Sequence, residues 1–161
     1  MPRKPDTKNE LMDVAQELIQ ERGYHAFSFK DVAARVGIKT ASMHYHFPAK
    51  PDLATALLVR YRGQFQESLD AIRAKSALKK LDALVGLFES THELGRMCLC
   101  GTLAADLNSL PEEVHAEVSG FYDDLRDWIR DVLKAGAASG ELRKVPQQST
   151  AEAVLGLLEG A

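Results

Sequence analysis

Apolar residues recur at intervals of three and four along most of this chain, with charged and polar residues between them. That spacing is typical of amphipathic α-helices, because residues three and four apart share one helix face. The pattern therefore predicts an all-α fold of about eight helices. Outside the segment discussed next, helices are expected over about 7–22, 50–75, 77–93, 97–107, 109–134 and 151–161.

The stretch of residues 27–50 predicts a helix, a tight turn and a second helix. Ser28 is a suitable N-cap, because its hydroxyl can accept a backbone N–H of the first turn. Asp31 follows three residues later, at the position of a capping-box partner. Apolar residues then recur at helical spacing up to Gly37, where a helix commonly ends in a residue of positive φ.

The second helix of this pair is predicted from Lys39 to Phe47, and Pro48 ends it because the residue before a proline is pushed out of the α region. Met43 and Phe47 lie four apart and give this helix one small apolar face. Its other sides carry polar and aromatic residues. A short polar helix held against a small apolar partner is typical of an element that enters a DNA major groove.

The run from Gly37 to Leu53, GIKTASMHYHFPAKPDL, resembles the recognition-helix signature of TetR-type (tetracycline-repressor-like) transcriptional regulators. That signature has a Gly, a small apolar residue, polar positions, an aromatic-rich run ending in Phe, and then a Lys and a Leu. The pairs Gly23-Tyr24 and Phe27-Ser28 also fit the family's loop between its first two helices. One position departs from the pattern, since His44 stands where the family usually has Tyr.

The resemblance implies a three-helix DNA-binding head over residues 1–50 and a helical effector-binding and dimerisation body over residues 51–161. It implies a homodimer on a pseudo-palindromic operator in double-stranded DNA, released by an unknown small-molecule effector. In this family the helix that starts at Lys50 joins head and body and acts as a lever. The family's last two helices form a four-helix dimer interface, and only one of that pair is present here. The chain either continues beyond Ala161 or is a shortened member.

Candidate DNA contacts follow from the predicted second helix. Recognition helices read bases with their N-terminal part, so residues 39–42 are expected near base edges, where Ala41 also suits a thymine methyl. Tyr45, His46 and Lys50 are expected at phosphates, and His44 suits either role. The full set of candidate DNA-binding residues is Ser28, Lys39, Thr40, Ala41, Ser42, His44, Tyr45, His46 and Lys50.

The net charge of −3 argues by itself against a nucleic-acid partner, but the charge is unevenly distributed. Residues 1–50 hold eight Lys or Arg and six Asp or Glu, whereas residues 51–161 hold twelve and seventeen. The positive end therefore coincides with the predicted helix-turn-helix, as phosphate neutralisation requires. Arg3 and Lys4 are expected either to follow a phosphate backbone or to belong to a disordered tail.

Large apolar side chains of the body are candidates for an effector pocket that suits an apolar or aromatic ligand, and a plain core is the alternative. The candidates are Phe88, Met97, Cys100, Phe121, Leu125 and Trp128. Three of them belong to a heptad-like stripe that predicts the buried face of the longest helix. That stripe consists of Val114, Val118, Phe121, Leu125, Trp128 and Val132.

Cys98 and Cys100 raise the question of redox or metal chemistry. Two thiols are too few for a four-ligand zinc site, to which His92 adds one ligand at most. A disulfide across one intervening residue needs an unwound backbone. We therefore expect both thiols to be small core groups, with oxidation sensing, favoured by the nearby Arg96, as the alternative.

Two further helix starts are predicted from local signals. Ser109 and Glu112 have capping-box spacing at the start of the longest helix, with a proline in its first turn. Ser149 or Thr150 is expected to cap the last apolar helix.

The sequence contains no nucleophile elbow with a Ser/His/Asp ordering, no phosphate-binding glycine loop and no metal-spaced His/Glu set. It therefore predicts no enzyme, no metal and no cofactor. No apolar run reaches the roughly 18 residues of a membrane span, and the N-terminus lacks an apolar signal segment, so the expected location is the cytoplasm. The predicted function is a ligand-responsive transcriptional regulator, most often a repressor. The alternative is an all-α small-molecule-binding protein or enzyme whose helix-turn-helix is only structural.

Overall fold

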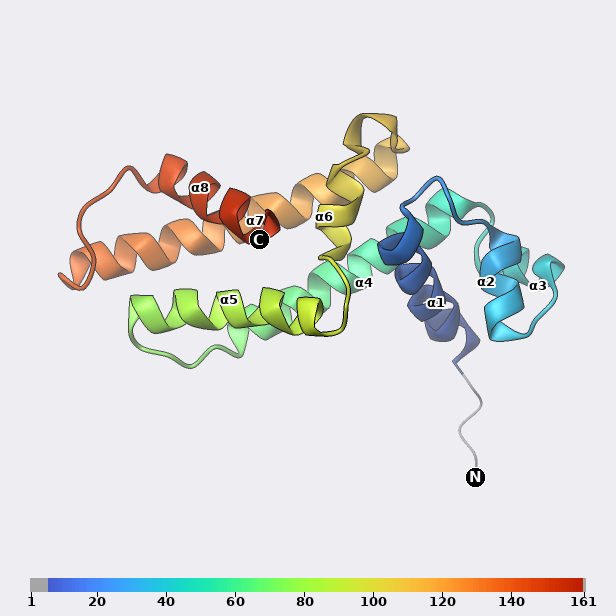
Figure 1. Ribbon diagram of the computed structural model, residues 1–161, viewed down its shortest axis with the longest axis horizontal. Helices are drawn as coiled ribbons and strands as arrows, with labels where there is room; N and C mark the ends of the chain where they lie inside the picture. The colour runs from blue at the N-terminus through green and yellow to red at the C-terminus, as the bar shows by residue number, and fades with distance from the viewer. Residues whose placement is uncertain (1–5, 161) are drawn as a thin grey trace, which may run out of the picture. The chain divides into compact units, whose positions relative to one another are not determined.

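The computed structural model describes residues 6–160, and within that range the chain is helical without strands, which confirms the predicted all-α fold (Figure 1). Arg3 and Lys4 lie outside the described residues. The helices are α1 (Thr7–Arg22), α2 (Phe29–Val36), α3 (Thr40–His46), α4 (Lys50–Asp70), α5 (Ala77–Glu93), α6 (Leu99–Ala104), the short 3₁₀ helix η1 (Leu107–Ser109), α7 (Glu112–Ala138) and α8 (Gln147–Glu159).

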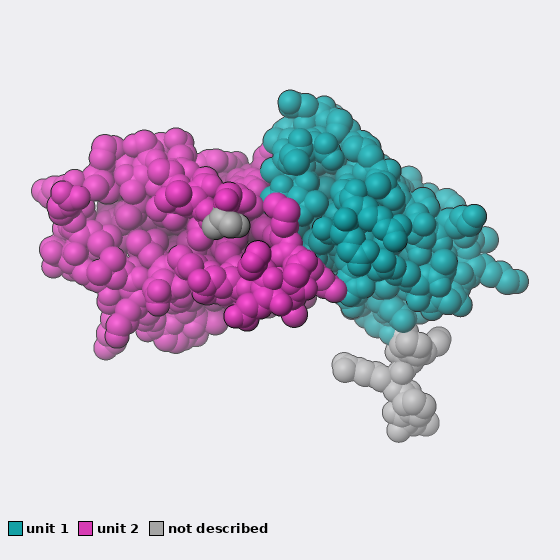
Figure 2. Space-filling view, in the orientation of Figure 1, with its two compact units in different colours: residues 1–62, 99–118 teal, residues 63–98, 119–161 magenta. Residues whose placement is uncertain are grey.

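The chain divides into two compact units, each built from two separate segments (Figure 2). Unit 1 comprises residues 1–62 and 99–118, and unit 2 comprises residues 63–98 and 119–161. Helices α4 and α7 therefore each contribute residues to both units. These units are defined by how the chain packs, whereas the predicted head and body are defined by their expected functions. The division into a DNA-binding head and an effector-binding body therefore stays a prediction.

Unit 1 is organised around α1, which packs against α2 and α6, while α2 packs against α3. The Asp6 carboxylate accepts the Asn9 backbone N–H at 3.4 Å and caps the start of α1, and Gly23 ends the helix with a φ of 80°. Both ends agree with the prediction. The buried face of α1 has the spacing of an amphipathic helix, and consists of Leu11, Met12, Ala15, Leu18 and Ile19.

Unit 2 contains a cluster of three aromatic rings from three helices. The Phe65 ring of α4 lies 5.0 Å from the Phe121 ring of α7 and 6.0 Å from the Phe88 ring of α5, both in edge-on arrangements. Such T-shaped pairs add to the stabilisation that burial alone provides. Phe121 is therefore part of the core of this unit, where it is 2% exposed.

The start of α5 is tied to the loop that follows α7. The Glu141 carboxylate accepts the backbone N–H groups of Ala77 at 2.8 Å and Leu78 at 3.1 Å, and it also accepts the Ser76 hydroxyl. These hydrogen bonds lower the pKa of Glu141, the one from the Ser76 hydroxyl most of all. The carboxylate thus satisfies N–H groups that a helix start leaves without partners.

Helix α7 also approaches the start of α5 closely, at Gly136. A Cβ added to Gly136 would lie 2.6 Å from Cδ1 of Leu142 and 2.7 Å from Cβ of Ala77. Those distances are well inside van der Waals contact, so only glycine fits here without movement of its neighbours.

Two helices are shorter than the apolar periodicity predicts. Helix α4 ends at Asp70 and not near Lys75, because the Arg73 guanidinium donates to the Asp70 carbonyl at 2.7 Å and satisfies the helix end. The helix expected over residues 97–107 is confined to α6 and is followed by η1.

Both additional helix-start predictions were wrong. Ser109 lies in η1, and its hydroxyl donates to the Asp106 carbonyl at 2.8 Å, so it does not cap α7. Helix α8 begins at Gln147, since Pro146, whose ring holds φ near −64°, occupies the cap position. The Ser149 hydroxyl donates to the Pro146 carbonyl inside the first turn.

The buried face of α7 follows the heptad-like stripe except at Trp128. Ile129 is fully buried, whereas Trp128 is only half-buried. Ile129 lies four residues after Leu125 and three before Val132, which is 5% exposed, so it shares the helix face of these two residues. The predicted burial of Trp128 is therefore replaced by that of Ile129.

Candidate nucleic-acid interface

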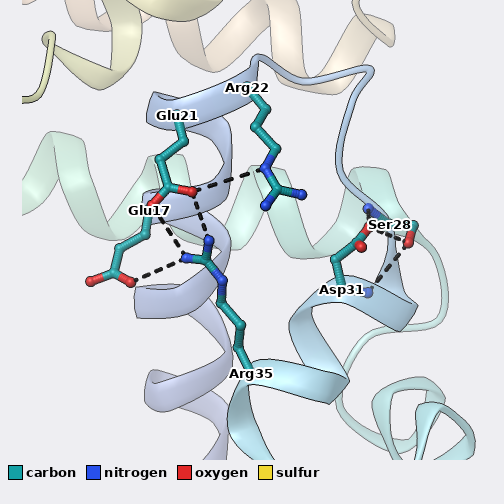
Figure 3. Close-up of polar contacts among 6 residues, drawn as sticks. All are labelled: Glu17, Glu21, Arg22, Ser28, Asp31 and Arg35. Carbon is teal, nitrogen blue, oxygen red and sulfur yellow. Dashed lines mark hydrogen bonds and ion pairs between the residues drawn. The ribbon is translucent and has the colours of Figure 1, made fainter.

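The entry to the helix-turn-helix is fixed by a reciprocal capping box, as predicted. The Ser28 hydroxyl accepts the Asp31 backbone N–H at 3.3 Å, and the Asp31 carboxylate accepts the Ser28 backbone N–H at 2.8 Å (Figure 3). The Ser28 hydroxyl also donates to the Asp31 carboxylate at 2.5 Å. These bonds lower the pKa of Asp31, chiefly through the Ser28 side chain. Ser28, a candidate DNA contact, is thus committed to starting α2.

The turn between α2 and α3 depends on Gly37, which adopts a left-handed conformation with φ of 79° and ψ of 26°. The backbone N–H groups of Gly37 and Ile38 both donate to the Ala33 carbonyl, at 2.9 and 3.0 Å. A side chain with Cβ is strained in this region, so glycine is the residue that allows α2 to end here. The reversal brings α3 against α2.

Helix α3 buries one narrow face and exposes the rest. Met43 and Phe47 are buried, as their spacing predicts. Tyr45 is 89% exposed, the largest exposed fraction among the big apolar and aromatic side chains of the described residues. The other exposed positions of α3 and its cap are Lys39, Thr40, Ala41, Ser42 and His44, and His46 is half-buried. Seven candidate DNA-binding residues therefore lie together on this helix and its cap.

His44, which stands in place of the family's usual Tyr, is held by its own chain. Its Nδ1 lies 3.0 Å from the Pro48 carbonyl oxygen, and its ring lies 5.2 Å from that of Phe29. Because a carbonyl only accepts, Nδ1 carries the hydrogen of this bond. The remaining nitrogen, Nε2, is the atom of His44 with which a DNA contact is to be expected.

Lys50 is turned toward the protein. Its ammonium donates to the Phe27 carbonyl at 2.7 Å and lies 4.5 Å from the Tyr24 ring centre and 4.4 Å from the Phe27 ring centre. Burial lowers the pKa of Lys50, partly opposed by the Asp31 carboxylate. In this conformation Lys50 fastens the start of α4 to the loop between α1 and α2.

Arg35 joins the helix-turn-helix to its supporting helix, and the sequence reasoning missed it. Its guanidinium on α2 pairs with Glu21 on α1 at 2.7 Å and with Glu17 at 3.6 Å (Figure 3). Arg22 lies 4.0 Å from the same Glu21 carboxylate. The bond to Glu21 raises the pKa of Arg35. A signal existed in the sequence, since Glu17 and Glu21 are four apart on one face of the first helix.

Unit 2 contains a cavity of about 210 Å³. One helical face of α5 supplies part of its wall, with residues at intervals of three and four. The complete lining is Val85, Phe88, Glu89, His92, Arg96, Met97, Cys98, Leu158 and Glu159. The cavity is thus mainly apolar, with acidic and basic groups in its lining.

Only two of the six candidate effector-pocket residues, Phe88 and Met97, line this cavity. Phe121, Leu125 and Cys100 are buried in the packing at 2, 1 and 1% exposure. Trp128 is half-buried and does not line the cavity either. Periodicity identified large apolar residues of α7, but it does not distinguish a residue that faces a hollow from one that faces a neighbouring helix.

Neither cysteine forms a disulfide and both are buried, as expected for small core groups. Cys98 precedes α6 and lines the cavity, where its side chain is hydrogen-bonded to the Glu159 carboxylate. A thiol that donates to a carboxylate keeps its proton in doing so, and the thiolate is the reactive form. Within residues 6–160, no three His, Cys, Asp or Glu side chains gather into a metal site. No helix in that range is long and apolar enough to cross a membrane.

Two family models match this chain. Residues 11–57 match that of the bacterial regulatory proteins of the tetR family, and residues 77–161 match the tetracyclin repressor-like C-terminal domain. The first match covers α2, α3 and their supporting helix α1 from Leu11 onward.

Known proteins resemble the chain over most of its length. The HTH-type transcriptional repressor KstR2 of Mycolicibacterium smegmatis is 28% identical, over 88% of this chain and 71% of the relative. A TetR transcriptional regulator from Legionella pneumophila has a structure with 34% identity and a TM-score of 0.83, covering 99% of this chain and 86% of that one. A TetR-family regulator from Agrobacterium tumefaciens has 32% identity and a TM-score of 0.92, covering 98% and 86%. This chain belongs to the TetR family of bacterial transcriptional regulators.

Proposed function

We propose that this protein is a cytoplasmic, homodimeric repressor that binds double-stranded DNA through α3 and leaves its operator when a small molecule occupies the cavity of unit 2. The observation that carries the DNA contact is the outer surface of α3. It combines Tyr45, at 89% exposure, with exposed hydroxyl and ammonium groups. The opposite face of the helix is packed into the protein through Met43 and Phe47. The name of the KstR2 relative supports repression as the direction of control.

The roles of the individual residues follow from position on α3. Lys39, Thr40 and Ser42 occupy its start and are proposed to lie at base edges. Tyr45 and His46, whose rings contact each other edge-on at 5.2 Å, are proposed to position the helix on phosphates. In a dimer, two such helices meet successive major grooves about 34–36 Å apart, which requires a pseudo-palindromic operator.

A salt-series DNA-binding titration tests the proposal. The DNA is the region flanking the gene, with a random duplex as control. We expect tight binding to this DNA. The logarithm of the binding constant should fall steeply as the logarithm of the salt concentration rises, because phosphate neutralisation releases counterions. If the flanking DNA binds no better than the random duplex, the titration is repeated with a pool of random sequences. If no sequence of that pool is preferred either, the result favours a helix-turn-helix that is only structural.

Substitutions in α3 separate the two kinds of contact. Thr40→Ala and Ser42→Ala are each expected to make the protein discriminate less between DNA sequences. Each should lower the binding free energy for the preferred sequence by about 1–3 kcal/mol through the loss of one base contact. Tyr45→Phe is expected to weaken binding to all sequences alike. Lys79→Ala, an exposed position on α5 in unit 2, is the matched surface control and should leave both quantities unchanged. Uniform losses from all three α3 variants would contradict the assigned roles.

A further inference from the structure

The lining of the 210 Å³ cavity in unit 2 contains two chemical kinds of side chain, which we call its apolar wall and its polar wall. The apolar wall includes the Phe88 ring and the Met97 thioether, and Met97 is 56% exposed despite its size. An aromatic ring offers its face to apolar or cationic groups, and a methionine side chain adapts its shape to what it contacts. This wall therefore suits a compact apolar or aromatic body.

The polar wall contains a carboxyl group that is incompletely satisfied. Oε1 of Glu159 is buried and has no hydrogen-bond partner among the described residues. Hydrogen bonds with Tyr122 and Cys98 favour the charged form of this carboxyl, yet burial outweighs them and raises its pKa. A buried acceptor without a donor costs free energy, so a ligand that brings a donor gains more here than at a hydrated carboxylate.

The balance of charge in the wall favours a cationic donor over an anionic group. Glu89 and Glu159 provide two carboxyl groups, and Arg96 provides the one permanent cation of the lining. Arg96 already has an interaction partner within the protein, whereas Oε1 of Glu159 has none. Glu159 belongs to the lining of the cavity, so its carboxyl group is within reach of a ligand bound there.

We propose that this cavity binds a small amine, with the Glu159 carboxylate accepting an N–H of its ammonium group and with Phe88 and Met97 enclosing its apolar body. The proposal rests on the ligand-responsive function proposed above and names the chemical class of its effector. It also assigns a role to Glu159, which lies outside the six residues expected from the sequence.

The size of the cavity limits the apolar body. An engineered protein cavity of about 150 Å³ accepts benzene, so a volume of about 210 Å³ has room for one such ring and a short aminomethyl group. The ammonium group can also lie near the face of the Phe88 ring, which attracts cations. Benzylammonium is therefore a suitable probe, and benzyl alcohol and benzoate have the same ring with a neutral or negative head group.

Calorimetric titration of the unmodified protein with these three probes, without DNA, is the first test. Benzylammonium is expected to bind at least tenfold more tightly than benzyl alcohol, and benzoate is expected to bind most weakly. Tighter binding of benzoate, which would make Arg96 the dominant group, overturns the proposal. So does equal binding, or a failure of benzylammonium to bind.

Glu159→Gln keeps the shape of the side chain and removes its charge. It is expected to reduce the affinity for benzylammonium at least tenfold and to change the affinity for benzyl alcohol less than twofold. Glu89→Gln, an acid in the same wall on α5, is the matched control with a smaller expected loss. An unchanged benzylammonium affinity in a folded Glu159→Gln variant contradicts the assignment. If the variant does not fold, the ranking of the three probes on the unmodified protein still tests the proposal.

The salt-series DNA titration separates this proposal from the regulator function. Operator binding without benzylammonium binding would overturn the amine site and leave the regulator function standing. Benzylammonium binding without operator binding would support the site and contradict the regulator function. If both occur, saturating benzylammonium is expected to weaken operator binding by a factor of about 5–150, the usual range of allosteric coupling.

Discussion

The ammonium group of Lys50 is positioned to stabilise the fold of unit 1. It donates to the Phe27 carbonyl at 2.7 Å and lies over two aromatic rings, which gives the loop between α1 and α2 a fixed contact with the start of α4. The family signature led us to expect a phosphate contact at this position. A phosphate contact and an internal hydrogen bond of the same ammonium predict different effects of substitution.

Lys50→Met is therefore expected to lower the free energy of unfolding by about 1–2 kcal/mol, because the Phe27 carbonyl loses a charged donor. The dependence of DNA affinity on salt should keep its slope. Lys39→Ala provides the comparison, since Lys39 is exposed at the cap of α3, and should reduce the salt slope by about 1 if it contacts a phosphate. Thermal melts and salt titrations of both variants measure these quantities. A reduced slope in Lys50→Met would restore the phosphate role.

At the scale of single elements, the start of α5 depends on one carboxylate from another part of the chain. The pKa of Glu141 lies below its ordinary value of 4.5, because the folded state donates three hydrogen bonds to the charged form. The stability that Glu141 provides is therefore complete above the unfolded-state pKa and is lost as the pH falls through the lower folded-state pKa.

Glu141→Gln is expected to reduce stability at neutral pH and to remove this part of the acid dependence, because an amide does not titrate. Denaturant unfolding of the variant and the parent at a series of pH values between neutral and strongly acid gives the comparison. Glu67→Gln, at an exposed position of α4, should leave the acid dependence as in the parent. An identical pH profile for Glu141→Gln and the parent would rule out the carboxylate as the helix cap.

The close approach at Gly136 gives a second prediction for α7. Gly136→Ala is expected to destabilise the protein by about 1–3 kcal/mol, because its Cβ would overlap Leu142 and Ala77. Gly86→Ala, inside α5, meets no atom within 4 Å and should stabilise the protein by roughly 0.4–1 kcal/mol. Denaturant unfolding of both variants measures the difference. Equal effects of the two substitutions would contradict the close contact.

The sequence was sufficient for elements whose ends depend on local chemistry. Asp6, Ser28, Asp31 and Gly37 form their caps with neighbours three or four residues away, so the bounds of α1 and α2 could be predicted. The sequence was insufficient where partners lie far along the chain. The Glu141 cap of α5 spans more than 60 residues, and the cavity combines α5 with the end of α8, so neither could be found from spacing alone.

At the scale of the whole molecule, unit 1 is completed by a segment distant in sequence. Residues 99–118 supply α6, which packs against α1, and they bury apolar side chains at six positions. Those positions are Leu99, Cys100, Leu103, Leu110, Val114 and Val118. The helix-turn-helix is therefore supported by more of the chain than the family signature covers.

A fragment of residues 1–62 is accordingly expected to fold poorly, although it contains α1, α2 and α3 in full. Without residues 99–118 it leaves part of the apolar face of α1 exposed to water, which removes a large share of the burial that stabilises the unit. Circular dichroism during heating should show a broad, weakly cooperative transition, whereas the 161-residue chain should melt sharply. A sharp melt of the fragment would show that α6 is dispensable.

The same arrangement sets an order of events during protein synthesis. Unit 1 receives its first segment by residue 62, but its second segment is complete only at residue 118. Those 56 residues take roughly 3–11 s to synthesise at the usual rate of about 5–20 residues per second. During that interval α1, α2 and α3 have been synthesised while the segment that supports them is unfinished, and the first segment of unit 2 is synthesised between the two parts. The helix-turn-helix therefore gains its complete support only after residues 63–98, the first of the two segments of unit 2, have been made.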